Sequence, residues 1–160
     1  LFMNYIVRQD IEKTIKEFSL NRNRIFEVSK QDYKQILKKI EQTFVLYGQT
    51  IHWANMGYYN QNFPVWTVDC RDNPFWVEKL NKIIPNPQNT VYVLFEEIGR
   101  QRPKYWVFEM YLEELIVILN ESIVNDYYIV SKKYDWLISE NHHSIVSFVG
   151  KSFHLSPMKI

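Results

Sequence analysis

The chain of 160 residues contains few of the small residues on which several kinds of binding site depend. Its four glycines, at positions 48, 57, 99 and 150, are too far apart to build a phosphate-binding loop or a dinucleotide fingerprint. The single cysteine, Cys70, excludes an intramolecular disulfide and a cysteine-based metal cage. The net charge of +1 provides no global field that would recruit nucleic acid or a membrane surface.

Long hydrophobic runs are also missing. The longest purely aliphatic stretch, residues 115–119, is far shorter than a membrane span. The apolar stretch 1–7 contains Asn4 and is followed directly by Arg8, so it is too short for the core of a signal peptide. We therefore expect a cytoplasmic protein that makes no contact with a membrane.

Aromatic residues, by contrast, are abundant and make up 16% of the chain. With a hydrophobic fraction of 46%, they supply enough apolar surface for a core, and the length fits a single α+β domain over residues 1–160. The 17 isoleucines and 13 asparagines against one alanine indicate AT-rich codons, as in an AT-rich genome or a mobile genetic island.

Hydrophobic periodicity predicts helices first and strands later. One helix is predicted behind Asp10, which is placed to cap it, and a second behind Ser29 and Asp32, a variant of the capping box. Further helices are predicted behind Asn73 and over 111–121. Strands are predicted at 64–70, 90–97, 104–110, 127–131, 135–139 and 144–149. The fold class is therefore α+β, with N-terminal helices followed by an antiparallel sheet with one inserted helix.

Two features indicate a surface for a protein partner. Between residues 89 and 121, six acids stand against three bases, which predicts an acidic face that steers a basic partner. The aromatic residues of the loop 49–63 follow no helical or strand period, and such residues commonly anchor interfaces. The alternative is that the charges only keep a hairpin and a helix start soluble. The candidate steering residues are Glu96, Glu97, Glu109, Glu113 and Glu114, and the candidate anchoring residues are Trp53, Tyr58, Tyr59 and His142.

Candidate catalytic residues are few. Glu140, His142 and His143 fall in one predicted turn, which would suit proton transfer and makes a small metal- or histidine-dependent hydrolase the alternative function. Arg71 could lower the pKa of the neighbouring Cys70 thiol, but no base stands near it in the sequence. A lone cysteine at a strand end is more often a buried small hydrophobe. We therefore predict no catalytic residue, no metal and no cofactor.

A basic stripe gives a further alternative. Lys30, Lys34 and Lys38 recur every four residues along one face of a predicted helix and could contact phosphates. Because no aromatic residues flank them, a solvated helix face is the preferred interpretation. Nucleic-acid binding is therefore kept as a further alternative and is not the expected function.

The C-terminal part carries a resemblance, which lies in residues 127–150, YYIVSKKYDWLISENHHSIVSFVG. This segment resembles the C-terminal part of small bacterial α+β proteins of unknown function, some of which look like immunity proteins of polymorphic or contact-dependent toxin systems. The resemblance depends mainly on Tyr134, Asp135, Trp136, Glu140, Asn141, His142 and Gly150. It implies a bacterial cytoplasmic protein, with immunity as a permitted role and no catalytic residue to transfer.

Together these observations favour a binding protein over an enzyme. The expected function is that of an immunity-type inhibitor, which neutralises a cognate bacterial toxin by direct complex formation. Its expected partner is a basic toxin domain, because the candidate surface combines acidic and aromatic residues.

Overall fold

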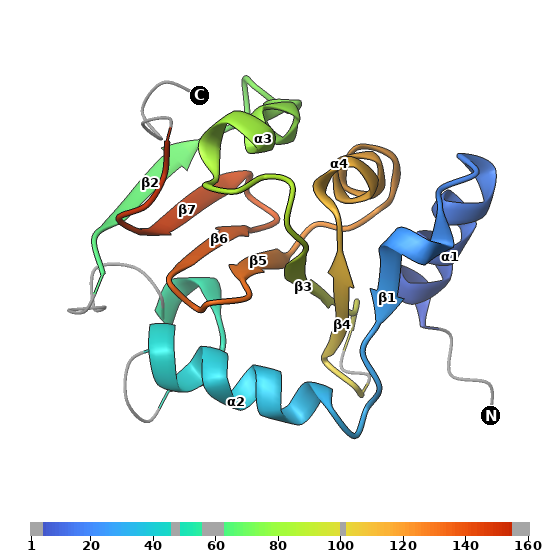
Figure 1. Cartoon of the computed structure of the whole chain (residues 1–160), viewed down its shortest axis with the longest axis horizontal. Coiled ribbons are helices and arrows are strands. Elements are labelled where there is room, and N and C mark those ends of the chain that lie inside the picture. Colours follow the sequence, from blue (N-terminus) through green and yellow to red (C-terminus); the bar gives the residue numbers. More distant parts are fainter. Residues whose placement is uncertain (1–4, 46–48, 56–62, 100–101, 155–160) are drawn as a thin grey trace.

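The computed structural model describes residues 5–45, 49–55, 63–99 and 102–154 (Figure 1). The α-helices in these ranges are α1 (Ile6–Glu17), α2 (Tyr33–Phe44), α3 (Leu80–Ile83) and α4 (Leu112–Glu121). Short 3₁₀ helices cover Arg22–Arg24, Trp53–Asn55 and Trp76–Lys79. The strands are β1 (Ile25–Glu27), β2 (Val65–Asp69), β3 (Val91–Glu96), β4 (Tyr105–Met110), β5 (Tyr127–Ser131), β6 (Trp136–Glu140) and β7 (Ile145–Gly150). None of the helices in the described part of the chain is long and apolar enough to cross a membrane.

The seven strands form one antiparallel sheet in the order β1-β4-β3-β5-β6-β7-β2. β3 and β4, predicted as strands over 90–97 and 104–110, form a hairpin, and β5, β6 and β7 follow as a meander. β2, from earlier in the chain, pairs with β7 at one edge, and β1 pairs with β4 at the other. The α+β class and the order of the main elements therefore agree with the sequence-based prediction.

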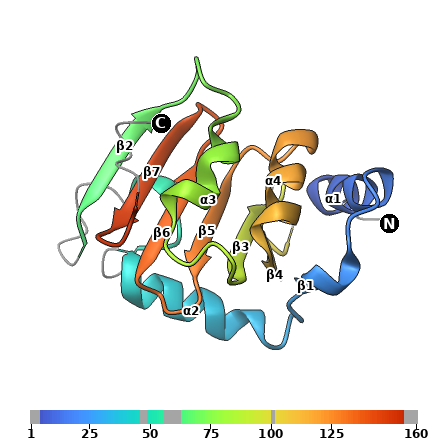
Figure 2. The ribbon, with the colours of Figure 1, turned by 45° about the horizontal axis from the view of Figure 1, so that its top comes forward.

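Helices cover both faces of the sheet, as Figures 1 and 2 show. On the α4 face, α1, α3 and α4 pack over a core that contains Phe95, Phe108 and Phe148. On the α2 face, Ile40 and Phe44 of α2 pack against a second core on the sheet. Both faces are covered, and the inner strand β3, predicted as a strand over 90–97, carries apolar residues on both sides.

The start of α1 differs from the prediction. The helix begins at Ile6, so Asp10 lies inside it and does not cap it. The carboxylate of Asp10 instead accepts a hydrogen bond from the backbone N–H of Ile123, at 2.7 Å. The first turn of α1 is capped by a residue from far along the chain. The carboxylate of Glu97 accepts a hydrogen bond from the backbone N–H of Val7, at 2.9 Å, so the helix does not need Asp10 as its cap.

Two other local predictions are corrected. No strand is predicted over 25–27, and yet β1 forms there, because three residues are too few to display a strand period. The helix predicted behind Asn73 is a 3₁₀ turn followed by the four-residue α3. In front of α2 the predicted capping pair does close a turn, with the Ser29 hydroxyl accepting from the backbone N–H of Asp32 at 3.2 Å.

Candidate functional site

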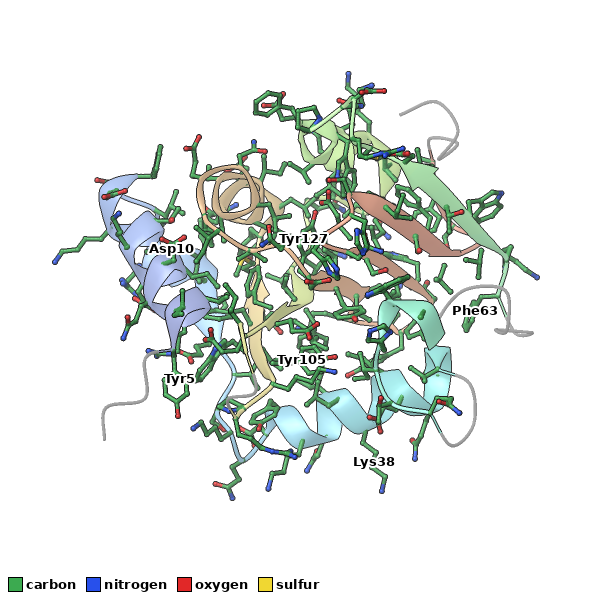
Figure 3. The ribbon with its side chains drawn as sticks, turned by 180° about the vertical axis from the view of Figure 1, so that it is seen from behind. Tyr5, Asp10, Lys38, Phe63, Tyr105 and Tyr127 are labelled. Carbon is green, nitrogen blue, oxygen red and sulfur yellow. The ribbon has the colours of Figure 1, made fainter. Side chains whose placement is uncertain are left out.

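One end of the α2 face carries polar side chains where the rest of that face is apolar. Tyr128 belongs to the core of this face, and its cross-strand partner is Ser139, which lies opposite Ser147. Glu96, at the end of β3, lies opposite Tyr105, which also belongs to this face. Directly opposed residues in an antiparallel sheet share a face. Tyr128, Ser139 and Ser147 therefore form one row of polar side chains across the strands, and Glu96 and Tyr105 form a second row on the same face. Figure 3 shows Tyr105 between the sheet and α2.

Four segments bring a group of ionisable and aromatic side chains to this end. We call the group the histidine end, and it comprises His52, Trp53, Glu96, Asp126, His142 and His143. The rings of His142 and His143 lie 4.0 Å apart between centroids, and the ring of His143 meets that of Trp53 edge-on at 6.4 Å. The ring of His52 lies 5.1 Å from that of Trp53. Residues far apart in the sequence therefore share one patch.

The turn between β6 and β7 is built to present the two histidines. Asn141 is buried, and its side-chain oxygen accepts from the backbone N–H groups of His143, at 2.9 Å, and Ile145, at 3.1 Å. Asparagine suits this position because its amide bonds locally to the backbone of a turn. The turn is completed by Ser144, whose φ of 58° lies in the left-handed region.

His142 is oriented by Asp126. Oδ1 of Asp126 lies 3.2 Å from the backbone nitrogen of His142 and 3.2 Å from its Nδ1. A carboxylate at Nδ1 holds an imidazole ring in place and favours a proton on that nitrogen, which leaves Nε2 as the acceptor. The side chain of His142 is 53% exposed, so Nε2 is accessible from solvent.

Glu96 is a half-buried carboxylate that lacks a direct counter-ion among the described residues. Burial raises the pKa of its carboxyl, and Asp126 adds to the increase, whereas Lys104 and His142 oppose it. Burial also lowers the pKa of His52, with a further contribution from Lys104. The Nδ1 of His52 accepts from the backbone N–H of Ala54, at 3.1 Å, as a neutral imidazole does.

Two buried hydroxyl groups lie beneath the histidine end. The hydroxyls of Tyr128 and Ser139 are each on a residue that is 1% exposed. In the described part of the chain the Ser139 hydroxyl has no hydrogen-bond partner, and the nearest polar groups to the Tyr128 hydroxyl are the Tyr105 hydroxyl and the backbone of Trp53. The neighbouring phenol of Tyr105 donates to the backbone oxygen of Ile51, at 2.7 Å. Burial raises the pKa of Tyr128, and the charges of Glu96 and Asp126 contribute to the increase, so both carboxylates act on this phenol.

The predicted acidic face divides between two faces of the sheet. Of the five candidate steering residues, Glu96 lies at the histidine end, but Glu97 points to the α4 face and is 4% exposed. Glu97 also accepts from Nε1 of Trp106, at 2.8 Å, and serves as an internal acceptor. Adjacent residues of a strand point to opposite faces, and a count of charges along the sequence does not take this into account. The prediction for Glu97 is therefore corrected.

The remaining candidate acids make ion pairs with other parts of the chain. Glu114 is buried and binds Nε of Arg24 at 2.6 Å, so its prediction as a steering residue is also corrected. Glu113 is 86% exposed and lies 3.6 Å from the same guanidinium. Glu109 binds the ammonium of Lys132 at 2.6 Å. These carboxylates do not join the patch at the histidine end.

The candidate anchoring residues are partly brought together. Trp53 is half-buried against the core of the α2 face, and His142 is exposed beside it. Tyr58 and Tyr59 lie outside the described residues. Three of the predicted partner-binding residues, Trp53, Glu96 and His142, therefore lie in one patch.

Sequence reasoning missed Asp126, Lys104 and Tyr128, although the position of Asp126 directly before a strand was a signal that it lies at the sheet end.

The candidate catalytic residues do not assemble as predicted. Glu140 faces away from the histidines, towards the α4 face, where it accepts from Nε1 of Trp76, at 3.1 Å, and from the hydroxyl of Tyr127. Burial raises the pKa of Glu140, while these two hydrogen bonds oppose the increase. The prediction that groups Glu140 with His142 and His143 is therefore wrong. Glu140 is the last residue of β6 and shares the α4 face with Ile138, whereas the two histidines lie in the turn that follows the strand.

Cys70 is not an activated thiol. It is buried, and burial raises its pKa to about 11, with Glu140 and Asp69 adding to the increase. Arg71 does not lower this pKa as considered from the sequence, because its guanidinium binds Asp69 at 2.7 Å. Within the described ranges, no group of three or more His, Cys, Asp or Glu residues is arranged to hold a metal ion.

The basic stripe is interrupted. Lys34 and Lys38 are exposed on α2, and Figure 3 shows Lys38 pointing away from the sheet. Lys30 precedes the helix, and its ammonium lies 5.7 Å from the centroid of the Trp106 ring. The three lysines therefore do not continue along a single helix face.

The fold and the site define an α+β protein with one antiparallel sheet and a polar patch of histidines and carboxylates at the sheet end. The chain belongs to a family of unknown function (DUF6756), whose profile matches residues 3–158. No curated protein and no solved structure matches the chain. The family description assigns no activity, so the function is argued from the site.

Proposed function

We propose that this chain is a binding protein, an immunity-type inhibitor that neutralises a cognate bacterial toxin in the cytoplasm by direct complex formation. The histidine end is its contact surface. The observation that carries this proposal is the convergence of Trp53, Glu96 and His142, three residues that the sequence indicates separately as partner-binding. They reach one patch from three segments of the chain.

The composition of the patch suits an interface with a basic protein. Aromatic and imidazole rings combine apolar area with hydrogen-bonding atoms, and such side chains are common at the centres of interfaces. Glu96 and Asp126 supply negative charge beside these rings, which favours approach of a positively charged surface. A hollow of about 420 Å³ adjoins His142 and His143 and extends to Asp69, so the contact surface continues beyond the patch itself.

Co-expression tests this function. The product of the gene next to the one encoding this chain is produced in a bacterial host alone, with this chain, and with its Trp53→Ala and His142→Ala variants. We expect the neighbouring product to stop growth, the unchanged chain to restore it, and both variants to restore it less well. Glu113→Gln is the matched control, because this exposed carboxylate lies away from the patch.

Two results would contradict the proposal. The first is a neighbouring product that is harmless, or that stays toxic although this chain is present and folded. The second is a pair of patch variants that neutralise as well as Glu113→Gln does. Circular dichroism of each purified variant separates a lost contact from a lost fold.

The orientation of His142 by Asp126 favours a second candidate, a histidine-dependent hydrolase. In such an enzyme, Nε2 of His142 would act as the general base that takes a proton from water. Hydrolysis of nitrophenyl acetate and nitrophenyl phosphate, followed from about pH 5 to about pH 8, tests it. A rate that His142→Ala and Asp126→Asn leave unchanged would rule out this role.

A further inference from the structure

A cleft lies on the α4 face, at the end of the sheet opposite the histidine end. It has a volume of about 500 Å³ and is lined by residues of the α3–β3 connection 85–91, by residues of the β5–β6 turn 131–136, and by Tyr111 and Ser152. Figure 2 shows the connection running from α3 past β6 and β5 to β3. We call this space the α3–β3 cleft. Small-molecule sites commonly have volumes of about 300–1,000 Å³, so the cleft is large enough for a ligand.

One wall of the cleft is a turn rich in amide side chains. The two prolines of this segment, Pro85 and Pro87, restrict its backbone, and the backbone N–H of Asn89 donates to the backbone oxygen of Asn86, at 3.0 Å. Asn86 has a φ of 53°, which asparagine tolerates better than most residues. The side chains of Asn86, Gln88 and Asn89 make no hydrogen bond with any described residue, so their donors and acceptors are available to a ligand.

Trp136, on the sheet side of the cleft, has an indole N–H without a partner. The residue is only 3% exposed, and its Nε1 makes no hydrogen bond within the described part of the chain. Nε1 is not one of the unpartnered atoms that are sealed from solvent in that part, so this N–H stays accessible on a residue that lines the cleft. Buried tryptophans usually place their N–H on an acceptor. The N–H of Trp136 therefore calls for an acceptor that a bound molecule supplies.

The carboxylate of Asp135, which precedes Trp136, is held in position by Ser131. The Ser131 hydroxyl donates to Oδ1 of Asp135 and accepts from the backbone N–H of Asp135, at 3.0 Å. Among the described residues no donor reaches Oδ2. An oriented carboxylate with one oxygen available accepts well from a hydroxyl group.

The charges around the cleft do not favour an ion of either sign. The ammonium of Lys132 is already bound by Glu109, at 2.6 Å. Of the other two charged lining residues, Lys133 is positive and makes no ion pair with a described residue, and Asp135 is negative. A neutral polar ligand therefore suits the cleft better than a phosphate or a cation.

We infer that the α3–β3 cleft binds a neutral monosaccharide. Amides and hydroxyls both donate and accept hydrogen bonds, as sugar hydroxyls do, and the hydroxyls of Thr90 and Ser152 add to the amides of the turn. The apolar side chain of Val91 offers surface for the C–H groups of a sugar ring. One sugar oxygen accepts from the indole N–H of Trp136, and one sugar hydroxyl donates to Asp135. This inference goes beyond the proposed function, because it concerns the other end of the sheet.

The test uses the purified full chain, labelled with ¹⁵N, and four monosaccharide probes: methyl α-D-glucopyranoside, methyl α-D-galactopyranoside, methyl α-D-mannopyranoside and N-acetyl-D-glucosamine. We expect at least one of them to shift the indole N–H signal of Trp136 and the backbone signals of residues 88–91, with a dissociation constant on the order of millimolar. Cyclohexanol has a six-membered ring with one hydroxyl, and inorganic phosphate is an anion. Both should leave these signals unchanged.

Two variants remove single groups from the cleft. Asp135→Ala and Asn89→Ala should each weaken binding of the tightest of the four probes by about fivefold or more. Asn125→Ala is the control, because this exposed asparagine precedes β5 at the other end of the sheet, and it should bind as the unchanged chain does. The same spectra show whether each variant is folded, and Asn89, on an exposed turn, keeps the test valid if Asp135→Ala does not fold.

Three results would overturn the inference. The first is that none of the four probes shifts these signals at about 50 mM, well above the expected dissociation constant. The second is that cyclohexanol or phosphate shifts them as strongly as the monosaccharides do. The third is that Asn89→Ala binds as tightly as Asn125→Ala. The experiment does not involve the histidine end, so its failure leaves the proposed function untouched.

Discussion

The carboxylate of Glu97 joins the start of α1 to the β3–β4 hairpin, and its replacement is expected to destabilise the protein strongly. The group is 4% exposed and lies at the positive end of the helix dipole. It accepts from the backbone N–H groups of Val7 at 2.9 Å, Arg8 at 3.4 Å and Ile98 at 3.0 Å, and from Nε1 of Trp106 at 2.8 Å. Four donors therefore depend on one buried negative charge.

Glu97→Gln keeps the shape of the side chain and removes its charge. The amide oxygen can still accept two of the four hydrogen bonds, but the amide NH₂ group then faces the other two donors. A hydrogen bond to a charged group contributes about 1.5–3 kcal/mol, and the interaction with the helix dipole about 0.3–1 kcal/mol. Loss of two such bonds and of the dipole interaction gives an expected destabilisation of about 3–7 kcal/mol, at the upper end for single substitutions.

Urea denaturation followed by tryptophan fluorescence measures this change. Glu113→Gln is the control, since its exposed carboxylate lies 3.6 Å from Arg24, and we expect a change below about 1 kcal/mol for such a pair. If Glu97→Gln unfolds at the same urea concentration as Glu113→Gln, then Glu97 is not the acceptor that holds the first turn of α1 and the reasoning is refuted.

Three further substitutions or reactions test other parts of the structure. Burial raises the pKa of Glu140 above its ordinary 4.5, so the folded state binds its proton more tightly than the unfolded state, and the stability of the unchanged chain should fall as pH rises through the raised pKa. Glu140→Gln removes this ionisable group, so the unchanged chain should lose stability relative to Glu140→Gln as the pH rises from about 4.5. A stability difference between the two that does not change with pH would contradict the raised pKa of Glu140. Cys70, with its pKa of about 11, should react with iodoacetamide far more slowly in the folded protein than in urea at the same pH, and equal rates would contradict its burial. Gly150→Ala should lower stability by about 2 kcal/mol or more, as urea denaturation would show, because the added Cβ would lie 2.8 Å from Cβ of Trp136 and φ at this position is 138°.

The regular elements could be predicted from the sequence because their patterns are local. The apolar stripe of residues 33–44 indicated a helix, and the same residues now pack on the α2 face. The strands of the second half carry runs of β-branched and aromatic residues, which is why the hairpin over 90–110 was recognisable. Local pattern was insufficient for β1, whose three residues display no period.

The candidate site could be predicted only in part, because it depends on which strands are neighbours. Glu96 and Glu97 are adjacent in the sequence and yet face opposite sides of the sheet. Asp126 approaches His142 because β5 pairs with β6 on one side and β3 on the other, and no residue pattern encodes that order. The sequence therefore indicated some residues of the patch and not the patch itself.

The affinity between this chain and the product of the neighbouring gene tests the central claim most directly. The dissociation constant of the purified pair is measured by isothermal titration calorimetry for the unchanged chain, for Trp53→Ala/His142→Ala, and for Glu113→Gln. Hot-spot residues of an interface each cost about 2 kcal/mol or more when truncated, so two of them together should weaken binding about 1,000-fold. Glu113→Gln should bind as the unchanged chain does. Equal affinity of the double variant and the unchanged chain would show that the histidine end is not the contact surface.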